Sequence, residues 1–376
     1  MQIFDLGRRI PTYWMARRQN RPNVLPMNYT LSLTYRCNSR CATCNIWRRK
    51  PADELTVEEW EKVLASIGES PYWVTLSGGE PLLRSESVAI AKRICTLTHP
   101  AVLNIPTNGL LSSRIVESVR EIANVSPTVD VVVNLSLDGW GEDHDRIRGV
   151  PGNFERAMET YRGLRALDAA NLTLGIHTVI SRLNVEKVPN LYMRVLENLA
   201  PDSYITEIAE ERVELGTLGE EITPTAKAYR QTIDVLMALQ ESLAIPMGLG
   251  KITWAFRQRY YKLVQRWLQE GIQPMPCYAG WASGQIMPDG EVWFCCIRGE
   301  TIGNLRDVDY DFRALWRGDQ AVALRERMRS EGCSCPLANA AYTNLLMHPK
   351  SLVGIARDVL TDRRTPTRKR AAPSEV

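Results

Sequence analysis

Several features that mark common functional classes are scarce or absent in this sequence. There are only four histidines, and none lies near the first group of cysteines, so a histidine-assisted zinc site is not indicated there. The net charge is only +3 and no aromatic RNA-binding motif is present, which gives no indication of a nucleic-acid partner. No apolar run is long enough to span a bilayer.

What is present fits an intracellular metalloprotein. The 376 residues allow one large or two modest domains, and a hydrophobic content of 44% is enough for substantial cores. No signal peptide precedes the nine cysteines, and their spacing suits metal ligation better than a disulfide framework. We therefore expect a reducing, cytoplasmic location.

The most informative stretch carries three closely spaced cysteines. Cys37, Cys41 and Cys44 are separated by four and three positions, so their thiols can bind three corners of a four-iron cluster. The fourth iron is then open to a small molecule, whereas an electron-carrying ferredoxin cluster normally has four cysteine ligands. The triplet therefore indicates catalysis, with a zinc site or a chance spacing as the alternative.

A buried strand at 72–76 ends in a glycine turn. It leads into Ser77, Gly78, Gly79 and Glu80, where the two glycines let the backbone approach a ligand and Glu80 adds a carboxylate. The alternative is a plain turn that carries a surface glutamate.

Another apolar strand, at 130–137, ends in hydroxyl and carboxylate side chains. Ser136 and Asp138 suit a ribose, whose neighbouring hydroxyls need both donors and acceptors. The alternative is that either residue caps the following turn, because Ser and Asp are common turn residues.

These motifs together resemble the signature of the radical S-adenosylmethionine (SAM) enzymes. CxxxCxxC follows an apolar run at 29–35, Gly-Gly-Glu-Pro follows the second strand, and 143–149 resembles the peptide-modifying and SPASM branches. The resemblance implies that the open iron binds SAM, that electron transfer cleaves it, and that a 5′-deoxyadenosyl radical abstracts hydrogen from an unactivated C–H bond. It implies a SAM site made of Ser77, Gly78, Gly79, Glu80, Asn108, Ser136, Asp138 and His177.

Strand-like and amphipathic helical stretches alternate along the first half of the chain. Such βα units predict a parallel sheet with its site at the carboxyl ends of the strands. Six units match the partial (β/α)6 TIM-like barrel of the radical SAM core, an α/β fold. The expected strands are 28–34, 72–76, 102–106, 130–137, 172–180 and 203–209, and the expected helices are 56–67, 85–97, 112–123, 153–168 and 184–199.

Charged residues follow the last two predicted strands. Glu207 and Glu210 fall at or beyond the barrel mouth, where they are candidates to orient substrate or take up a proton. The alternative is a solvated loop with ion pairs.

The C-terminal third carries a second cysteine group. Cys277 precedes a Pro-Asp-Gly turn between two short strands that end at Cys295. This order resembles the SPASM domain in its shortened twitch form, which implies an auxiliary [4Fe-4S] cluster on Cys277, Cys295, Cys333 and Cys335. The closing pair is CxC, whereas CxxC is more usual. Cys296 is a candidate to replace Cys295 or to return hydrogen to a substrate radical. A zinc ribbon is the alternative.

Both ends of the chain are basic and amphipathic. Apolar residues recur at helical spacing from Ile3 to Trp14 among arginines, and Pro11 is expected to kink or restart that helix. A second stripe from Leu352 to Val359 precedes a basic tail. Such ends suit an anionic membrane surface, and the alternative is packing on the barrel with a solvated tail.

We predict a five-part chain and a two-cluster enzyme. The parts are a basic segment (1–23), the barrel (24–215), a helical bridge (216–272), the twitch-like domain (273–336), and a C-terminal helix with a basic tail (337–376). The expected partners are SAM, a reductant such as flavodoxin or ferredoxin, and a peptide, small-molecule or lipid-linked substrate. The net reaction is oxidation, bond formation or epimerisation. The alternatives are a sugar or aminocyclitol enzyme of the same superfamily and a non-catalytic iron–sulfur scaffold or redox protein.

Overall fold

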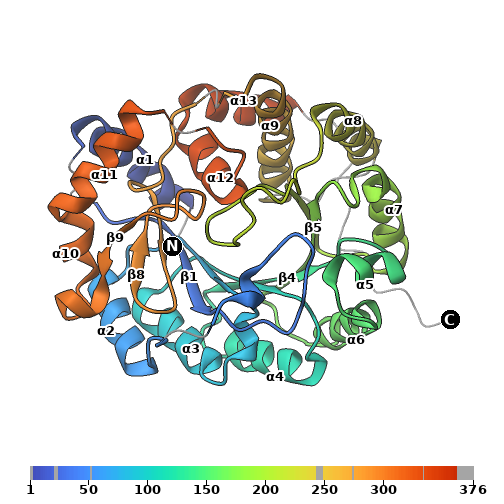
Figure 1. The fold of residues 1–376 in the computed structure, drawn as a ribbon, viewed down its shortest axis with the longest axis horizontal. Coiled ribbons are helices and arrows are strands. Elements are labelled where there is room, and N and C mark those ends of the chain that lie inside the picture. The colour runs from blue at the N-terminus through green and yellow to red at the C-terminus, as the bar shows by residue number, and fades with distance from the viewer. Residues whose placement is uncertain are drawn as a thin grey trace.

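The protein is built around one curved sheet, seen here in a computed structural model (Figure 1). The structure describes residues 3–20, 24–50, 53–242, 249–272, 275–332 and 334–361. The first six strands are all parallel and lie in sequence order. They are β1 (Asn28–Thr34), β2 (Trp73–Gly78), β3 (Val102–Thr107), β4 (Asp130–Ser136), β5 (Leu172–Ile180) and β6 (Ser203–Ile208). The predicted partial (β/α)6 barrel is confirmed.

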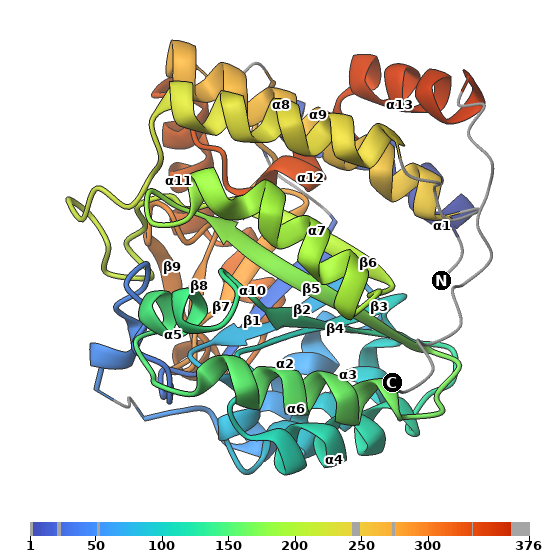
Figure 2. The same ribbon diagram turned by 90° about the vertical axis from the view of Figure 1, so that its right-hand side faces the viewer.

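Helices cover the convex face of this sheet (Figures 1 and 2). The first of them begins with a capping box, in which Thr56 and Glu59 satisfy backbone N–H groups that have no partner within the helix. These helices are α2 (Val57–Ile67), α3 (Ser87–Thr98), α4 (Ser112–Ala123), α5 (Glu142–Arg148), α6 (Asn153–Arg165) and α7 (Val188–Asn198).

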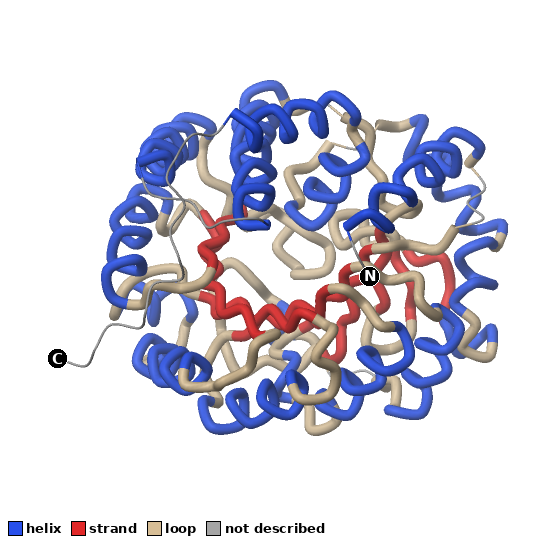
Figure 3. Tube along the Cα trace, turned by 180° about the vertical axis from the view of Figure 1, so that it is seen from behind, coloured by secondary structure: helices blue, strands red, loops and turns tan. Residues whose placement is uncertain are grey.

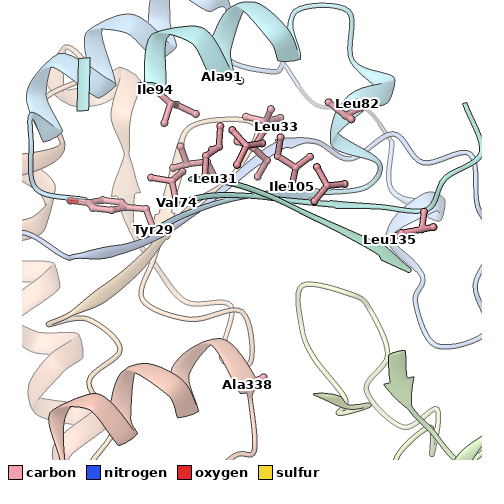
Figure 4. Close-up of a cluster of buried hydrophobic side chains, with 14 of the residues drawn as sticks. Tyr29, Leu31, Leu33, Val74, Leu82, Ala91, Ile94, Ile105, Leu135 and Ala338 are labelled. Carbon is pink, nitrogen blue, oxygen red and sulfur yellow. The ribbon is translucent and has the colours of Figure 1, made fainter. Parts of the chain in front are cut away.

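The two faces of the sheet differ in polarity. On β1, Tyr29, Leu31 and Leu33 belong to the main hydrophobic core, together with residues of the neighbouring strands and helices (Figure 4). The intervening Thr30 accepts a hydrogen bond from Asn339 on the opposite side, at 2.7 Å. Successive strand residues point to opposite faces, so the concave face is polar and the convex face is apolar.

The C-terminal hairpin extends the barrel sheet. Strand β7 (Ser283–Ile286) pairs parallel with β1, and β8 (Glu291–Trp293) and β9 (Thr301–Asn304) follow as antiparallel neighbours. The turn between β7 and β8 contains Gly290 at φ +90°, which confirms the predicted Pro-Asp-Gly hairpin. The second cysteine module is therefore joined to the barrel by backbone hydrogen bonds. The five-part division itself remains a prediction.

Further helices lie along the open side of the arc of strands and beside the hairpin (Figure 3). The predicted bridge contains α8 (Ala226–Ser242) and α9 (Leu249–Glu270), and the C-terminal part contains α12 (Ala338–Met347) and α13 (Pro349–Thr361). Two helices, α10 (Phe312–Arg317) and α11 (Asp319–Ser330), flank the hairpin.

The N-terminal segment forms a single helix. It runs from Ile3 to Gln19 as one helix, α1, with Pro11 inside it, so the helix does not restart at this proline, and a kink there stays a prediction. Its buried residues, including Tyr13, pack against Trp281 and Met347. This apolar face is covered by the protein itself. The basic tail after residue 361 lies outside the described residues. Within the part of the chain that the structure describes, no helix is long and apolar enough to cross a membrane.

Candidate functional site

The first cysteine loop begins where β1 ends. Backbone N–H groups of Arg40 and Ala42 donate to the carbonyls of Arg148 and Ile147, at 3.0 and 2.8 Å. Gly149 is needed beside them, because a Cβ at its φ of +66° would lie 2.3 Å from the Arg40 carbonyl oxygen. The end of α5 therefore fixes the loop from a distant part of the chain.

The three cysteines of this loop are all half-buried. Within the loop, the Cys44 N–H donates to the Cys41 carbonyl at 3.2 Å. Burial raises the pKa of the Cys37 thiol to about 11 and that of Cys44 to about 12. Iron binds thiolates, so ligation here must release protons. In the described ranges, no three His, Cys, Asp or Glu side chains converge on one position suited to a single metal ion. Each cysteine of a four-iron cluster binds a different iron, so cluster ligands need not converge in that way.

Arg148 connects this loop to the end of β4. Its Nη1 lies 3.8 Å from Cys41 Sγ, and its Nη2 lies 2.8 Å from Asp138 Oδ2. The other oxygen of Asp138 accepts a hydrogen bond from the Val179 N–H at 2.8 Å. Each oxygen of Asp138 thus already has one partner within the protein, and its expected contact with ribose stays a prediction. Arg148 therefore links Asp138 to the first cysteine loop.

The two glycines after β2 allow a close approach to the cysteine loop itself. A Cβ on Gly78 would lie 2.2 Å from the Thr34 carbonyl oxygen, and one on Gly79 would lie 2.1 Å from that of Arg36. The N–H groups of Gly79 and Glu80 donate to these same carbonyls, at 2.7 and 2.9 Å. Gly78 and Gly79 therefore let this turn lie close to the backbone that precedes Cys37. Their expected close approach to a ligand stays a prediction.

Glu80 is buried and binds to the end of β3. Its carboxylate accepts from the Thr107 hydroxyl at 2.9 Å and from the Asn108 N–H at 2.7 Å. Burial raises its pKa to about 7, because these hydrogen bonds only partly offset the loss of water. The Asn108 side chain in turn donates to Asn38 Oδ1 at 2.8 Å and lies 3.9 Å from Cys37 Sγ. Glu80 and Asn108 thus support the cysteine loop, and their part in the SAM site stays a prediction.

The other predicted SAM-site residues lie on adjacent strands. Ser77 is half-buried near the end of β2, beside Ser32 of β1. Ser136 is half-buried at the end of β4 and is paired in register with His177 of β5. His177 Nε2 lies 3.6 Å from Glu207 Oε2. The sheet therefore brings Ser136, His177 and Glu207 into one neighbourhood.

Two supporting side chains were not singled out from the sequence. His144 is fully buried, accepts the Asp138 N–H at Nδ1 (3.1 Å) and lies 3.1 Å from Asn153 Oδ1 through Nε2, so Nε2 carries the proton. Burial lowers its pKa to about 4. Arg84 donates to the Leu33 carbonyl at 2.8 Å and so fixes the end of β1. No pattern in the sequence indicates that His144 would bind the Asp138 backbone or that Arg84 would bind the Leu33 carbonyl.

The segment after β6, residues 209–217, is named here the crossing segment. Its Leu215 carbonyl accepts the N–H of Asn45, the residue after Cys44, at 2.9 Å. Its Glu214 N–H donates to the Cys296 carbonyl at 3.2 Å. Figure 2 shows this segment on the same side of the sheet as the cysteine loop and the hairpin. One short stretch therefore touches both cysteine regions.

The second cysteine region is assembled from distant parts of the chain. Cys277 precedes β7 and is half-buried, Cys295 follows β8 and is half-buried, and Cys335 precedes α12 and is buried. Cys333 lies outside the described residues. The Cys296 thiol lies 3.9 Å from Arg212 Nη1 and so faces the crossing segment.

Arg325 stabilises the hairpin beside these cysteines. It is fully buried, donates to the Gly280 carbonyl at 2.6 Å and lies over the rings of Phe294 and Trp316, at 4.8 and 4.7 Å from their centroids. Burial lowers its pKa to about 9. Phe294 is adjacent to Cys295, so this cation orders the hairpin next to a predicted ligand.

A cysteine loop at the mouth of a partial α/β barrel, with a second cysteine module on the same sheet, is the arrangement expected of a radical SAM enzyme with an auxiliary cluster domain. The radical SAM superfamily profile matches residues 31–195, and the SPASM iron–sulfur cluster-binding domain profile matches residues 277–336. The chain belongs to the radical SAM superfamily and carries a C-terminal SPASM domain. These domains imply SAM and [4Fe-4S] clusters as cofactors.

Two curated relatives align over most of the chain. The sporulation killing factor maturation protein SkfB of Bacillus subtilis is 27% identical over 324 residues, 83% of this chain and 70% of that protein. The AdoMet-dependent heme synthase of Methanosarcina barkeri is 29% identical over 303 residues, 76% of this chain and 80% of that protein.

A solved structure shares the fold. Streptococcus suis SuiB bound to precursor peptide SuiA superposes with a TM-score of 0.60 at 15% identity, and the match covers 92% of this chain and 78% of that chain. The likeness supports the architecture of barrel and C-terminal domain.

Proposed function

We propose that this chain cleaves SAM reductively and modifies a peptide. When bound, SAM and the first cluster supply a 5′-deoxyadenosyl radical that abstracts hydrogen from an unactivated C–H bond. The observation that carries the proposal is the crossing segment, which hydrogen-bonds to Asn45 beside one cysteine region and to Cys296 in the other. A substrate held beside this segment would lie between the two cluster sites.

The chain's own residues divide the work around the first cluster. Cys37, Cys41 and Cys44 would ligate it, and Arg148 would stabilise negative charge at Cys41. The turn at Gly78–Glu80 would hold the SAM amino group, and Ser136 would bind the ribose. In this assignment Asp138 orients Arg148 instead of contacting the ribose.

The second cysteine group would hold the auxiliary [4Fe-4S] cluster. Its proposed ligands are Cys277, Cys295, Cys333 and Cys335, and its use would be to accept an electron from the substrate or to bind the substrate. We propose a flavodoxin or ferredoxin as the reductant. Cys296, whose thiol faces the crossing segment, would be placed to return hydrogen if the net reaction is an epimerisation.

A peptide is the substrate class that the observations favour. SuiB, which shares the fold, is bound to a precursor peptide, and charged groups of the barrel mouth suit polar side chains. The sequence indicated a lipid-linked substrate partly through a basic amphipathic N-terminal segment suited to a membrane surface. That indication is weaker because the apolar face of α1 packs on Trp281 and Met347. Because one relative is a heme synthase, a tetrapyrrole is the alternative substrate class that the experiment must distinguish from a peptide.

Deuterium transfer into 5′-deoxyadenosine tests this choice. Cells grown in deuterated medium would supply three separate extracts, containing peptides, lipids or small polar metabolites including tetrapyrroles. We expect the reduced, reconstituted protein to place deuterium in 5′-deoxyadenosine only with the peptide extract. Transfer from the lipid or small-molecule extract alone would overturn the peptide assignment while leaving SAM cleavage intact.

A further inference from the structure

A group of charged side chains lies at the barrel mouth, on β6 and the crossing segment, and one of them is next to His177 of the expected SAM site. Glu207 is the second-last residue of β6. Glu210, Arg212 and Glu214 belong to the crossing segment. Glu210 and Glu214 are each only 4% exposed. In the sheet order, β5, β4 and β3 separate Glu207 from the glycine turn at the end of β2. Glu214, by contrast, contacts Gln285 of β7, the strand that pairs with β1, so the group spans the mouth from β6 to β7.

The group carries more negative than positive charge. Arg212 Nη2 lies 2.6 Å from Glu210 Oε1, while its Nη1 is directed to the Cys296 thiol at 3.9 Å. Glu214 receives a hydrogen bond from the Gln285 amide, which is a neutral partner. Three carboxylates thus surround one guanidinium, and His177 Nε2 lies 3.6 Å from Glu207 Oε2.

Within this group, Glu210 is a buried carboxylate whose hydrogen-bonding capacity is not fully used. Neither of its buried oxygens accepts a hydrogen bond of normal geometry from any described residue, although Oε1 pairs with Arg212. A buried carboxylate that lacks donors is costly, so native proteins rarely leave one without a partner. Burial raises the pKa of Glu210 to about 7, which reflects the same deficit.

We infer that the barrel mouth binds a positively charged group of the substrate, an ammonium or a guanidinium, on the free oxygen of Glu210. Glu207 and Glu214 surround this position with further negative charge. A ligand carboxylate on Arg212 would instead face three carboxylates in a region with little water, where like charges repel strongly. The inference rests on the proposed peptide function, in which a lysine, an arginine or the peptide's amino terminus would provide the cation.

Small organic ions test this site without any radical chemistry. The reconstituted full-length protein, saturated with SAM, would be titrated with n-butylguanidinium, n-butylammonium and butyrate by ligand-observed NMR. We expect the two cations to bind with about millimolar affinity and butyrate not to bind. Glu210→Gln should weaken cation binding by at least about tenfold, because it removes the charge but keeps the shape.

The control is Glu197→Gln, which removes the same charge from an exposed position on α7 and should leave cation binding unchanged. Iron content and SAM affinity should match wild type in both variants, which shows that the fold and the SAM site are intact. Glu210→Asp should retain part of the binding. Equal cation binding by wild type and Glu210→Gln would overturn the inference.

Two further results would also overturn it: tighter binding of butyrate than of the cations, or loss of SAM affinity in Glu210→Gln. The second would mean that Glu210 serves the cofactor. If cation binding follows Glu210 while the peptide extract transfers no deuterium, the cation site stands and the proposed peptide function fails.

Discussion

The two cysteine regions are built in contrasting ways. Cys37, Cys41 and Cys44 occupy one short loop, and backbone hydrogen bonds from the end of α5 and the glycine turn after β2 fix it. The auxiliary set is spread from Cys277 to Cys335, before β7, after β8 and before α12. Local spacing therefore defines the first site, whereas the second exists only when the hairpin and the C-terminal helices have packed.

The largest expected effect comes from removing the local site. Changing Cys37, Cys41 and Cys44 together to alanine should lower the iron content of reconstituted protein from about eight to about four per chain. The auxiliary region should keep its cluster, because the hairpin pairs with β1 ahead of the cysteine loop. Iron and sulfide analysis with absorption spectroscopy would measure this. An iron content unchanged from wild type, or full zinc occupancy, would contradict the assignment.

Two single substitutions in the auxiliary cysteine set test its ligand assignment in the same way. Cys295→Ala should lose the auxiliary cluster and about half of the iron, while Cys296→Ala should keep both clusters. The reason is that the Cys296 thiol faces Arg212 in the crossing segment. Iron analysis of both variants measures this difference. Loss of the cluster in Cys296→Ala with retention in Cys295→Ala would make Cys296 the ligand instead of Cys295. Intact clusters without product in Cys296→Ala would indicate a hydrogen-donating thiol and hence epimerisation.

The contact between Arg148 and the first loop should matter for cleavage more than for assembly. Arg148→Met removes the cation beside Cys41 and leaves the buried Asp138 carboxylate without its partner. SAM cleavage should fall about 10- to 100-fold, the usual size for groups that support metal ligands.

Rates of 5′-deoxyadenosine release, together with the electron paramagnetic resonance signal of the reduced cluster, would measure this effect. Arg146→Met is the control, because Arg146 is exposed and pairs only with Asp143 among described residues. Equal loss in both variants, or no loss in Arg148→Met, would show that the contact has no role in positioning the cluster.

The smallest expected effect concerns the joint between barrel and C-terminal domain. Glu59 on α2 binds Arg306 at 2.9 Å and the Tyr310 hydroxyl at 2.6 Å, and the hydrogen bond from Arg306 lowers its pKa to about 2. Glu59→Gln should destabilise the cluster-free protein by about 1–2 kcal/mol at neutral pH.

The pH dependence of this effect follows from the lowered pKa. The stabilisation by Glu59 is complete above its ordinary pKa of 4.5 and is lost as the pH falls toward 2. The difference in melting temperature between wild type and Glu59→Gln should therefore narrow between pH 7 and about pH 3.5. Glu58→Gln, an exposed change in the same helical turn, should show no such difference. A gap that does not depend on pH would mean that the ion pair does not join the two domains.

The elements of the barrel were predictable because their signals are local. The predicted strand 28–34 coincides with β1, and 112–123 coincides with α4, since alternating and amphipathic patterns specify these segments directly. At Pro11 the sequence left a kink or a restart of the helix open, and α1 does not restart there, because burial of Tyr13 and its neighbours outweighs the missing hydrogen bond.

The contacts within the site were less predictable, because they join residues far apart in sequence. Arg148 and Cys41 are separated by 107 positions, and only the fold brings them to 3.8 Å. The pairing of β7 with β1 and the two contacts of the crossing segment have the same origin. Motifs thus indicated which residue types serve the cofactors, whereas the placement of their supporting groups required the structure.

The first cysteine region is proposed to form the SAM-cleaving centre, and 5′-deoxyadenosine release tests that assignment most directly. Wild-type protein, reconstituted without oxygen and reduced, should convert SAM to 5′-deoxyadenosine and methionine. The triple variant of Cys37, Cys41 and Cys44 should form none, although its auxiliary cluster remains. Release by that variant at the wild-type rate, or no release by fully loaded wild type, would contradict the account.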